Sequence, residues 1–492
     1  MVFSSASFIF AFLPLTLVSY LAAERSGSIR VKNAVLLVCS FIFYAWSGVK
    51  YALLLCVSVA VNYCLGRMIA GSEKTPVQGA DTAGFQARPG NGVQRKLLLA
   101  AGILWNVGIL FYYKYLGLFV PSFHVLMPIG ISFFTFQIMS YLFDVYYGTV
   151  PAQMSYPRLL LYVMLFPQLI AGPIVRYHDV NDAIGGRHSD SDMVHDGLRR
   201  FMTGFIKKVF LANEMGLMAD AAFGMVPALS TTEAWLGILC YTLQIYLDFS
   251  AYSDMAIGLG RVFGFHFLEN FNYPYIAGTM QEFWRRWHIS LSTWFRDYVY
   301  IPLGGSRRGT IRTYVNLIIV FLLTGFWHGA AWSFVLWGAY HGLFLILERL
   351  GLSRILKKIP APIRHIYTLL AVMTGWVFFR AESIGDAVLY LKCMFVQRIF
   401  GLYHIEIAEL LSNEFMTMLI LSLIISVPVV RVVFGKIDGM DQAAANAGTA
   451  SSGNISGSIL SVLADLVVLG LFALAVLYML GASFNPFIYF RF

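Results

Sequence analysis

The chain has 492 residues, of which 58% are hydrophobic and only 12% are charged. Soluble domains carry about 25% charged residues, so this composition excludes a soluble protein and indicates a membrane protein. The net charge of +9 fits cytoplasmic loops rich in Lys and Arg, so we expect no nucleic-acid partner. The five cysteines lie in apolar context without a paired motif, which predicts neither a disulfide framework nor a zinc site.

A series of apolar runs predicts about 11 to 13 membrane helices, several of them tilted, broken or re-entrant. The runs cover residues 4–22, 34–47, 51–70, 97–118, 126–147, 157–174, 232–260, 313–328, 331–349, 366–383, 386–400, 414–434 and 457–482. The first run has no basic region before it and is followed by Arg25, Arg30 and Lys32. We therefore expect a retained span with its N-terminus outside the cytoplasm.

Polar segments between the runs indicate how the chain is organised. Residues 71–96 predict a flexible cytoplasmic loop, and the low-complexity residues 437–457 predict a disordered linker. Residues 198–211 alternate basic and apolar side chains at helical spacing, which predicts an amphipathic helix on the inner leaflet. Because no internal repeat is visible, we expect one membrane domain over 1–492 with its core at 126–350.

The apolar run at 243–264 contains polar side chains, including Gln244, Asp248 and Asp254. Acidic side chains inside a membrane segment are costly, so they face a partner or a water-filled cavity. Two interpretations stay open at this point. The acids pair with arginines of the following segment, or they line a substrate tunnel.

Residues 266–312 combine aromatic bulk with six arginines and His288. Charged side chains exclude an ordinary lipid-facing span, and Pro274, Pro302 and Gly304 interrupt any long helix, so we expect short helices that dip into the cytoplasmic leaflet. The segment is either a basic juxtamembrane region that fixes topology and binds lipid headgroups, or a basic vestibule for an anionic substrate. Interleaved tryptophans favour a nucleotide or pantetheine in the second case.

Residues 321–349 predict a helical hairpin with its apex at Gly329, because basic loops stand on both sides of it. Sixteen residues separate Arg312 from His328, roughly 24 Å of helix, so His328 is expected at or beyond the middle of the membrane. A lone histidine on an apolar face is either a hydrogen-bonded core residue or a catalyst. His341 and His365, near helix ends, are expected to be structural.

Several segments carry a resemblance to a known family. They are PQLIAGPIVRY at 167–177, YLDFSAYSDMAIGLG at 246–260, NFNYPY at 270–275, FWRRWHISLSTWFRDYVYIPLGG at 283–305, FLLTGFWHGAAW at 321–332 and NPFIYFRF at 485–492. Together they resemble the membrane-bound O-acyltransferase (MBOAT) family, and within it the bacterial AlgI-like branch that O-acetylates polysaccharides. The segments run over most of the chain in the expected order.

The resemblance implies an all-α polytopic protein, a ring-like bundle of membrane helices with re-entrant segments and a central tunnel. It implies an O-acyltransferase of the bacterial inner membrane, with acetyl-CoA as donor substrate, no bound cofactor and no metal. The acceptor would be an extracytoplasmic polysaccharide such as alginate or peptidoglycan. A lipase-like extracytoplasmic partner would complete the transfer in this branch, and membrane lipid would surround the protein.

The resemblance also implies two functional histidines, His288 in WHIS and His328 in FWHG, and His328 is the principal one. His328 would deprotonate an acceptor hydroxyl or carry the acetyl group covalently, and His288 would orient the thioester. The candidate substrate-binding residues are Arg285, Arg286, Arg296, Trp287, Trp327, Asp248, Gln244 and Asn270. The arginines suit the phosphates of CoA.

Other functions have less support in the sequence. The sequence contains no H-x-x-x-x-D, G-x-S-x-G, P-loop or H-E-x-x-H motif, which excludes the acyltransferase and hydrolase chemistries that depend on them. Transfer of a D-alanyl or other acyl group from a carrier protein to a wall polymer stays open. A flippase or transporter also stays open, although such folds often contain inverted repeats.

Overall fold

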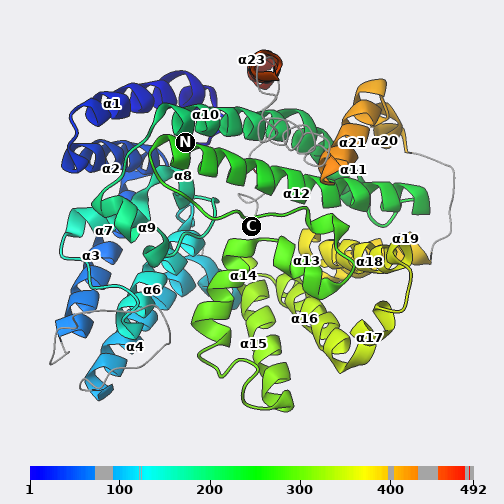
Figure 1. The fold of residues 1–492 in the computed structure, drawn as a ribbon. Coiled ribbons are helices and arrows are strands. Elements are labelled where there is room, and N and C mark those ends of the chain that lie inside the picture. Colours follow the sequence, from blue (N-terminus) through cyan, green and yellow to red (C-terminus); the bar gives the residue numbers. More distant parts are fainter. Residues whose placement is uncertain are drawn as a thin grey trace. The chain divides into compact units, whose positions relative to one another are not determined.

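The computed structural model describes residues 1–71, 92–120, 122, 125–396, 404–429, 453–481 and 487, and this part of the chain contains helices and no strand (Figure 1). The predicted all-α class is therefore confirmed. Most of the predicted flexible segments 71–96 and 437–457 lies outside the described residues. Within the described residues, α4 (Gly92–Leu110) and α23 (Gly453–Gly481) begin inside these predicted segments, so residues 92–96 and 453–457 are helical.

The chain forms two compact units. Unit 1 comprises Met1–Leu198, Ala256–Glu269 and Thr293–Leu303, and unit 2 comprises Arg199–Met255, Asn270–Ser292 and Gly304–Phe492. The prediction of one domain over the whole chain stays a prediction, and each unit is described by itself below.

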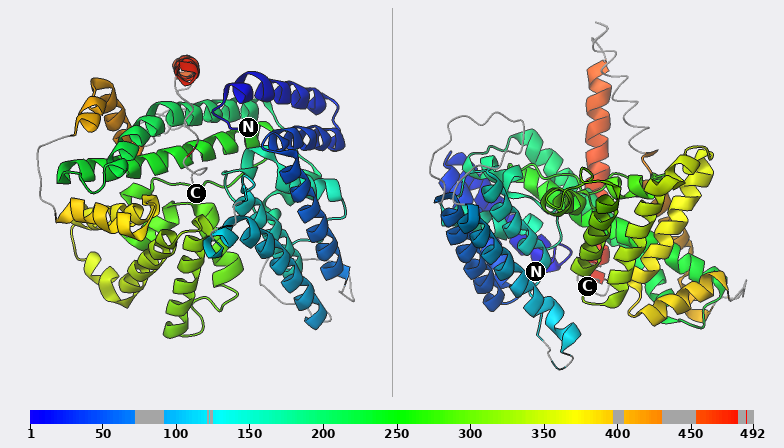
Figure 2. Two further views of the ribbon diagram at one scale, coloured as in Figure 1. Left: turned by 180° about the vertical axis from the view of Figure 1, so that it is seen from behind. Right: turned by 90° about the horizontal axis from the view of Figure 1, so that it is seen from below.

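The N-terminal part of unit 1, Met1–Leu198, is a set of packed helices that appear in blue to blue-green in Figures 1 and 2. Its main helices are α1 (Leu13–Arg25), α2 (Ile29–Ala45), α3 (Val49–Gly71), α4 (Gly92–Leu110), α6 (Ile131–Tyr147), α7 (Tyr156–Met164), α8 (Phe166–Leu169) and α9 (Tyr177–Gly185). Every side chain of α6 from Ile131 to Val145 is buried, so this helix is the core of the unit. Gly130 and Gly148, both with positive φ, bound α6 because such a conformation costs glycine nothing.

The predicted amphipathic segment is helical. It lies at the end of α10 (Ser191–Ile206) and in the π-helical turn η3 (Lys207–Ala212), and α11 (Asn213–Gly224) follows it. The next helix, α12, runs from Thr231 to Val262 and covers the predicted span 232–260. Parts of α10 and α12 belong to each unit.

Unit 2 holds most of the C-terminal half. Its other elements include the 3₁₀ turn η4 (Pro274–Ile276), α13 (Met280–Arg286), α15 (Thr310–His328), α16 (Trp332–Leu347), η6 (Glu348–Leu352), α17 (Ser353–Leu356), α18 (Ala361–Arg380), α19 (Ile384–Phe395), α20 (Ile405–Leu410), α21 (Asn413–Ile425) and α23 (Gly453–Gly481). Helix α14 (Ile289–Phe295) begins in unit 2 and, like the turn η5 (Arg296–Tyr300) after it, ends in unit 1.

The helices α15 and α16 form the predicted hairpin, with Gly329 directly after α15. They approach closely because a side chain is missing on each of two facing glycines. A Cβ on Gly325 would strike the backbone oxygen of Phe334, and a Cβ on Gly338 would strike that of Phe321. Neither glycine can therefore be enlarged without moving the two helices apart.

Among the described residues, five helical segments are long and apolar enough to cross a membrane by length and composition: Phe8–Arg25, Val49–Gly71, Gly92–Phe119, Thr310–His328 and Ser461–Gly481. This supports a multi-pass membrane protein. The larger number of membrane helices stays a prediction, because α2 and α6 have 17 residues and α16 has 16. The predicted span 157–174 is broken into α7 and α8 at Leu165, whose backbone leaves the helical region.

Candidate functional site

His288 lies between α13 and α14 in unit 2 and is 1% exposed. Its Nδ1 is 3.0 Å from Oδ1 of Asn270. The same Asn270 oxygen accepts hydrogen bonds from the hydroxyl of Ser290 at 2.9 Å and from its backbone N–H at 3.4 Å. The amide nitrogen of Asn270 donates to the hydroxyl of Ser253 on α12 at 3.1 Å. Asn270 is thus held on both sides and fixes the imidazole.

This network assigns the proton on His288. The backbone N–H of Ser290 can only donate, so the Asn270 atom that faces it is the carbonyl oxygen. Nδ1 of His288 must then carry the hydrogen that Asn270 accepts. The neutral ring therefore presents a lone pair at Nε2, which is buried without a hydrogen-bond partner among the described residues. A buried acceptor in this state is suited to take a proton or a hydrogen bond from a ligand.

The backbone of His288 is in the left-handed region, with φ of 43°. A residue with a Cβ rarely adopts this conformation, and residues that do so cluster at functional sites. The conformation reverses the chain between α13 and α14, where Ile289 N–H donates to the backbone oxygen of Asn270 at 2.9 Å. The turn is therefore built to hold the His288 ring beside Asn270.

His328 is the last residue of α15 and is 6% exposed. Its ring packs edge-on against three aromatic rings: Trp327, Trp337 and Phe379, with centroid separations of 4.9, 5.1 and 5.0 Å. The end of a helix carries a partial negative charge, which stabilises a positive charge on an imidazole there. His328 therefore stands at the C-terminal end of a helix, enclosed by aromatic rings.

Trp327 connects the two histidines. Its ring centroid is 6.2 Å from that of His288 and 4.9 Å from that of His328. Unit 2 therefore brings together two histidines that are forty positions apart in the sequence. His341, by contrast, is fully buried among Trp284 and Trp337, with ring centroids 5.1 and 5.0 Å away.

The three candidate arginines are in different situations. Arg285 is exposed, and no hydrogen bond or ion pair engages it among the described residues. Arg286 is held by Glu282 at 2.9 Å and by the backbone oxygen of Asn272 at 3.1 Å. Arg296 lies in unit 1, is 60% exposed and pairs with Asp297 at 2.7 Å. Of the three, only Arg285 keeps its full donor capacity for a substrate.

Of the three remaining candidates of unit 2, Trp287 and Asp248 have structural partners. Trp287 is buried and packs against Phe271 and Trp376, with ring centroids 5.0 and 4.8 Å away. Asp248 pairs with Lys208 at 2.8 Å, and both side chains are almost completely buried. Gln244, one turn before Asp248 on α12, is buried with its Oε1 unbonded among the described residues.

One of the two interpretations paired the acids of 243–264 with arginines of the next segment, and the ion pairs in the structure differ from it. Asp248 pairs with Lys208, and Asp254 pairs with Lys207 at 2.6 Å and with Arg200 at 2.9 Å. All three cations come from the preceding α10 and η3. The amphipathic helix faces α12 at this point, so its basic side chains neutralise these acids.

Sequence reasoning missed Glu348 and the two serines beside Asn270. Glu348 is buried, and its carboxylate accepts hydrogen bonds from the backbone N–H groups of Met280 at 2.6 Å and Gln281 at 3.0 Å. It therefore caps the start of α13, which leads to Arg285 and His288. An acid that ends an apolar hairpin was the available signal.

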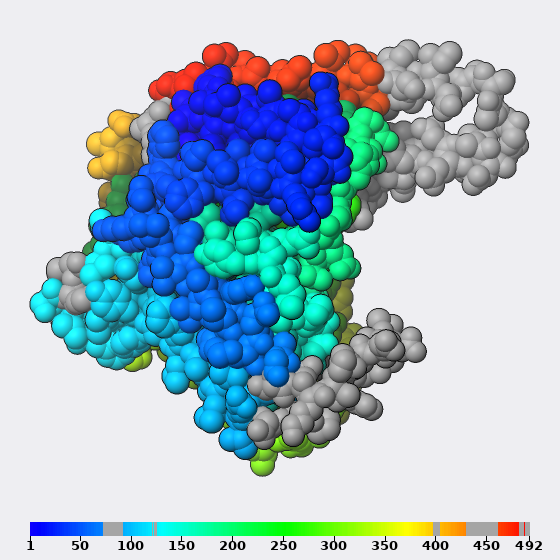
Figure 3. Space-filling view, turned by 90° about the vertical axis from the view of Figure 1, so that its left-hand side faces the viewer, coloured from blue at the N-terminus to red at the C-terminus, as the bar shows by residue number. Residues whose placement is uncertain are grey.

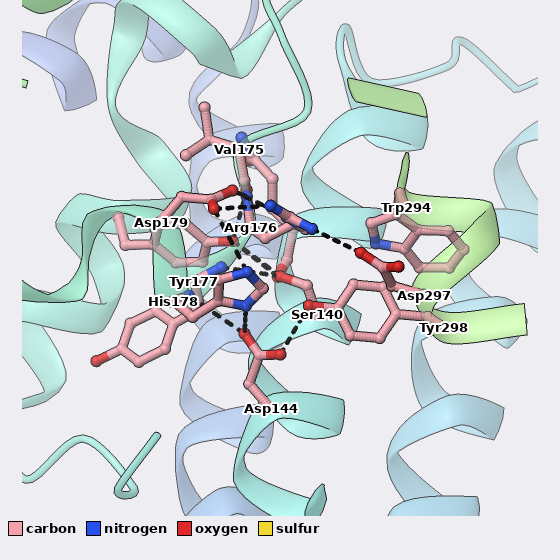
Figure 4. Close-up of polar contacts among 12 residues, drawn as sticks. Ser140, Asp144, Val175, Arg176, Tyr177, His178, Asp179, Trp294, Asp297 and Tyr298 are labelled. Carbon is pink, nitrogen blue, oxygen red and sulfur yellow. Dashed lines mark hydrogen bonds and ion pairs between the residues drawn. The ribbon is translucent and has the colours of Figure 1, made fainter. Parts of the chain in front are cut away.

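A second polar cluster, also missed, lies entirely in unit 1 (Figure 4). Asp144 of α6 accepts hydrogen bonds from the Tyr298 hydroxyl at 2.7 Å and lies 2.9 Å from Nδ1 of His178. Arg176 binds Asp179 at 2.9 Å and Asp297 at 2.7 Å. We call these residues the ionic network. It joins α6, α9 and η5, so two of the segments that carry the family resemblance meet here.

Comparison with known proteins gives consistent matches. The model of MBOAT, the membrane-bound O-acyltransferase family, matches residues 147–380. The probable alginate O-acetylase AlgI of Azotobacter vinelandii is 41% identical, with 100% of both chains covered. The peptidoglycan O-acetyltransferase of Helicobacter pylori is 34% identical over 80% of each chain. The teichoic acid D-alanyltransferase of Bacillus subtilis is 29% identical over 46% of this chain and 60% of its own.

Proposed function

This chain belongs to the membrane-bound O-acyltransferase family and is an O-acyltransferase, and from that premise we propose that it transfers acetyl from cytoplasmic acetyl-CoA for O-acetylation of an extracytoplasmic polysaccharide. The observation that carries the proposal is the pair of histidines joined by Trp327, with an open lone pair on His288 Nε2. The alginate and peptidoglycan relatives support acetyl as the group and a polysaccharide as the acceptor.

Acyl transfer from a thioester to a hydroxyl requires a base. The hydroxyl proton moves to an imidazole nitrogen, the oxygen forms a bond to the acetyl carbon, and the carbon–sulfur bond breaks to release the thiolate of CoA. We assign the base to His328, because the end of α15 stabilises the imidazolium that forms. His288 accepts a hydrogen bond through Nε2 and thereby holds the hydroxyl or the donor in place.

The alternative of D-alanyl transfer has weaker support. The teichoic acid D-alanyltransferase covers less than half of this chain, whereas the probable alginate O-acetylase covers all of it. A separate extracytoplasmic acetyltransferase that receives the group from this chain is part of the proposal. The proposal also places this chain in the inner membrane, because its multi-pass helices need a bilayer and its proposed donor, acetyl-CoA, is cytoplasmic.

The test uses the full chain, purified and reconstituted in liposomes. Acetyl-CoA labelled in the acetyl group is supplied on one side and soluble polysaccharide on the other, and both thiol release and label in the polymer are measured. We expect thiol release that depends on His328. If labelled acetyl-CoA is not consumed by folded protein, the assignment of acetyl-CoA as the acyl donor is wrong. A D-alanyl-loaded carrier protein as sole active donor would instead assign the teichoic-acid activity.

A further inference from the structure

A cavity of 360 Å³ opens on unit 1 between the start of α2 and the start of α7. Its polar lining includes Arg30, Asn33 and Arg158, and its apolar lining consists of Ala34, Leu37 and Pro157. Figure 3 looks onto this side of unit 1, where the blue surface of the N-terminal helices meets the blue-green surface that follows α6. The cavity thus offers two guanidinium groups beside an apolar wall.

The two arginines differ from their basic neighbours. Lys32 binds Glu24 at 3.0 Å and the backbone oxygen of Arg187 at 2.7 Å. Arg187 is itself held by the backbone oxygen of Phe263 at 2.8 Å. The backbone N–H of Arg158 donates to the backbone oxygen of Ser155 at 3.2 Å, but no ion pair or hydrogen bond to the guanidinium group of Arg30 or Arg158 is found within the described part of the chain. These two positive charges face the cavity without a counter-charge from the protein.

The wall behind the arginines is fixed. The side-chain nitrogen of Asn33 donates to the backbone oxygen of Ile184 at 3.0 Å, and its oxygen accepts from Arg187 at 2.6 Å. Both hydrogen-bonding ends of Asn33 are therefore used by the protein, and this side chain shapes the cavity. Recognition of a ligand is left to the arginines and the apolar wall.

We infer that this cavity binds a phosphate group, and that the group belongs to an anionic phospholipid. Guanidinium groups bind phosphate oxygens by strong charge-assisted hydrogen bonds. The apolar wall suits an acyl chain, and α2 continues away from the cavity with exposed Val38 and Ile42, 58% and 50% accessible. Arg30 also belongs to the basic loop expected at the cytoplasmic face, where anionic lipids are enriched.

Phosphatidylglycerol is the probe for the test, because it carries the phosphate on a neutral headgroup. It is titrated onto purified full-length protein, and the retained lipid is measured by native mass spectrometry. The double variant Arg30→Gln/Arg158→Gln is expected to bind it at least about tenfold more weakly, because two charge-assisted contacts are lost. The matched control Arg25→Gln/Arg349→Gln removes two exposed charges that do not line the cavity, and it should retain the lipid like the wild type.

Equal weakening in both double variants would overturn the site, because net charge alone would then govern retention. A further variant, Ala34→Trp, fills the cavity without changing any charge and is expected to lose the same lipid. Unchanged retention in Ala34→Trp would also overturn the site. The unfolding temperature of each variant is measured alongside, so that a folding defect is recognised directly.

A competition arm separates the two sources of phosphate. Excess inorganic phosphate should not displace phosphatidylglycerol from the wild type, because it lacks the acyl chains that the apolar wall contacts. If inorganic phosphate binds with dependence on Arg30 and Arg158 while the lipid is not retained, the phosphate site stands and the lipid assignment is overturned. Neutral phosphatidylcholine in place of phosphatidylglycerol should be retained less well.

Discussion

The histidine site of unit 2 and the ionic network of unit 1 hold imidazoles in opposite ways. In unit 2, His288 gives one ring nitrogen to Asn270 and keeps Nε2 without a partner among the described residues. In unit 1, His178 has a carboxylate near each nitrogen, Asp144 at 2.9 Å and Asp179 at 3.4 Å. His288 therefore keeps a ring nitrogen that a ligand can contact, whereas both ring nitrogens of His178 lie near carboxylates of the protein.

This difference indicates that the histidine site of unit 2 takes part in catalysis and that the ionic network of unit 1 stabilises the fold. A buried polar atom without a partner costs about 1–3 kcal/mol, so a ligand that donates a hydrogen bond to His288 Nε2 would recover that cost. The ionic network has no such cost, because each of its charges lies beside an opposite one. We therefore expect changes in unit 2 to act on turnover and changes in the network to act on stability.

The largest effect is expected at His328. Replacement by Gln keeps polarity and hydrogen bonding but removes the base, and general base catalysis typically contributes about 10²–10⁴-fold to rate. His328→Gln and His328→Ala should therefore both lose polymer acetylation by at least that range while the protein still accumulates in the membrane. Ester-linked acetyl in the extracted polymer and the amount of membrane protein are the two measurements.

His266→Gln is the matched control for this change, because His266 is exposed in a loop. It should acetylate like the wild type. His341 is unsuitable as a control, since it is fully buried among tryptophans and its removal would leave a cavity. Wild-type acetylation by His328→Gln would remove the histidine pair from the centre of the mechanism.

The second effect concerns the proton on His288. Asn270→Asp replaces the amide by a carboxylate that still accepts from Nδ1 but can no longer donate to Ser253. Asn270→Leu removes the acceptor and frees the ring to take the other tautomer. We expect Asn270→Leu to lower turnover by about 10–100-fold and Asn270→Asp to retain more of it. Measured kcat in liposomes decides, and equal kcat in both variants and wild type would contradict the tautomer assignment.

The helices could be predicted from the sequence because apolar runs of membrane length are directly visible in it. The predicted hairpin at 321–349 corresponds to α15 and α16, and the predicted span at 232–260 corresponds to α12. The break of 157–174 at Leu165 was not predicted. Hydropathy counts apolar side chains and does not register a single residue whose backbone leaves the helix.

The site was predicted only in part. His288, His328 and Asn270 stand in segments that carry the family resemblance, and unit 2 brings them to one place. The ion-pair partners of the acidic residues in 243–264 could not be predicted, since an ion pair such as Asp248–Lys208 depends on how helices pack. A sequence does not show which arginine has a hydrogen-bond or ion-pair partner within the protein, so only the structure distinguishes Arg285 from Arg286.

In unit 1, a change in the ionic network is expected to lower the stability of the fold and to leave turnover unchanged. Arg176→Gln leaves the carboxylates of Asp179 and Asp297 without their shared cation, and all three side chains are mostly buried. The cost should be about 2–3 kcal/mol, seen as an unfolding temperature several degrees lower in detergent. Turnover per folded molecule should stay near that of the wild type. A large fall in kcat at unchanged unfolding temperature would show instead that the ionic network takes part in catalysis.

Arg285 should give a smaller effect on donor binding. Its exposed guanidinium is the one candidate arginine that no described residue engages, so Arg285→Ala should raise the apparent KM for acetyl-CoA by about 3–10-fold with little change in kcat. Arg349→Ala removes an equally exposed cation and is the control. If both variants have the wild-type KM, the vestibule is only a topological signal.

The smallest effect is the pH dependence that His178 confers on stability. His178 lies in the short helix α9, outside the membrane-spanning segments. Burial acts to lower its pKa, but the hydrogen bond and charge of Asp144 and the charge of Asp179 outweigh burial and the nearby Arg176, so the pKa is raised above 6.5. The imidazolium is therefore favoured in the folded state over the unfolded one.

The sign of the effect follows from that shift. A raised pKa in the folded state contributes stability that is fully present below the unfolded pKa and is lost as the pH rises through the folded pKa. As the pH rises above about 6.5, His178→Gln should flatten the fall in unfolding temperature relative to the wild type. All other titrating groups are common to both proteins and cancel in the difference. Parallel curves for the two proteins would show that His178 is neutral in the fold and that the network is held by Arg176 and Tyr298 alone.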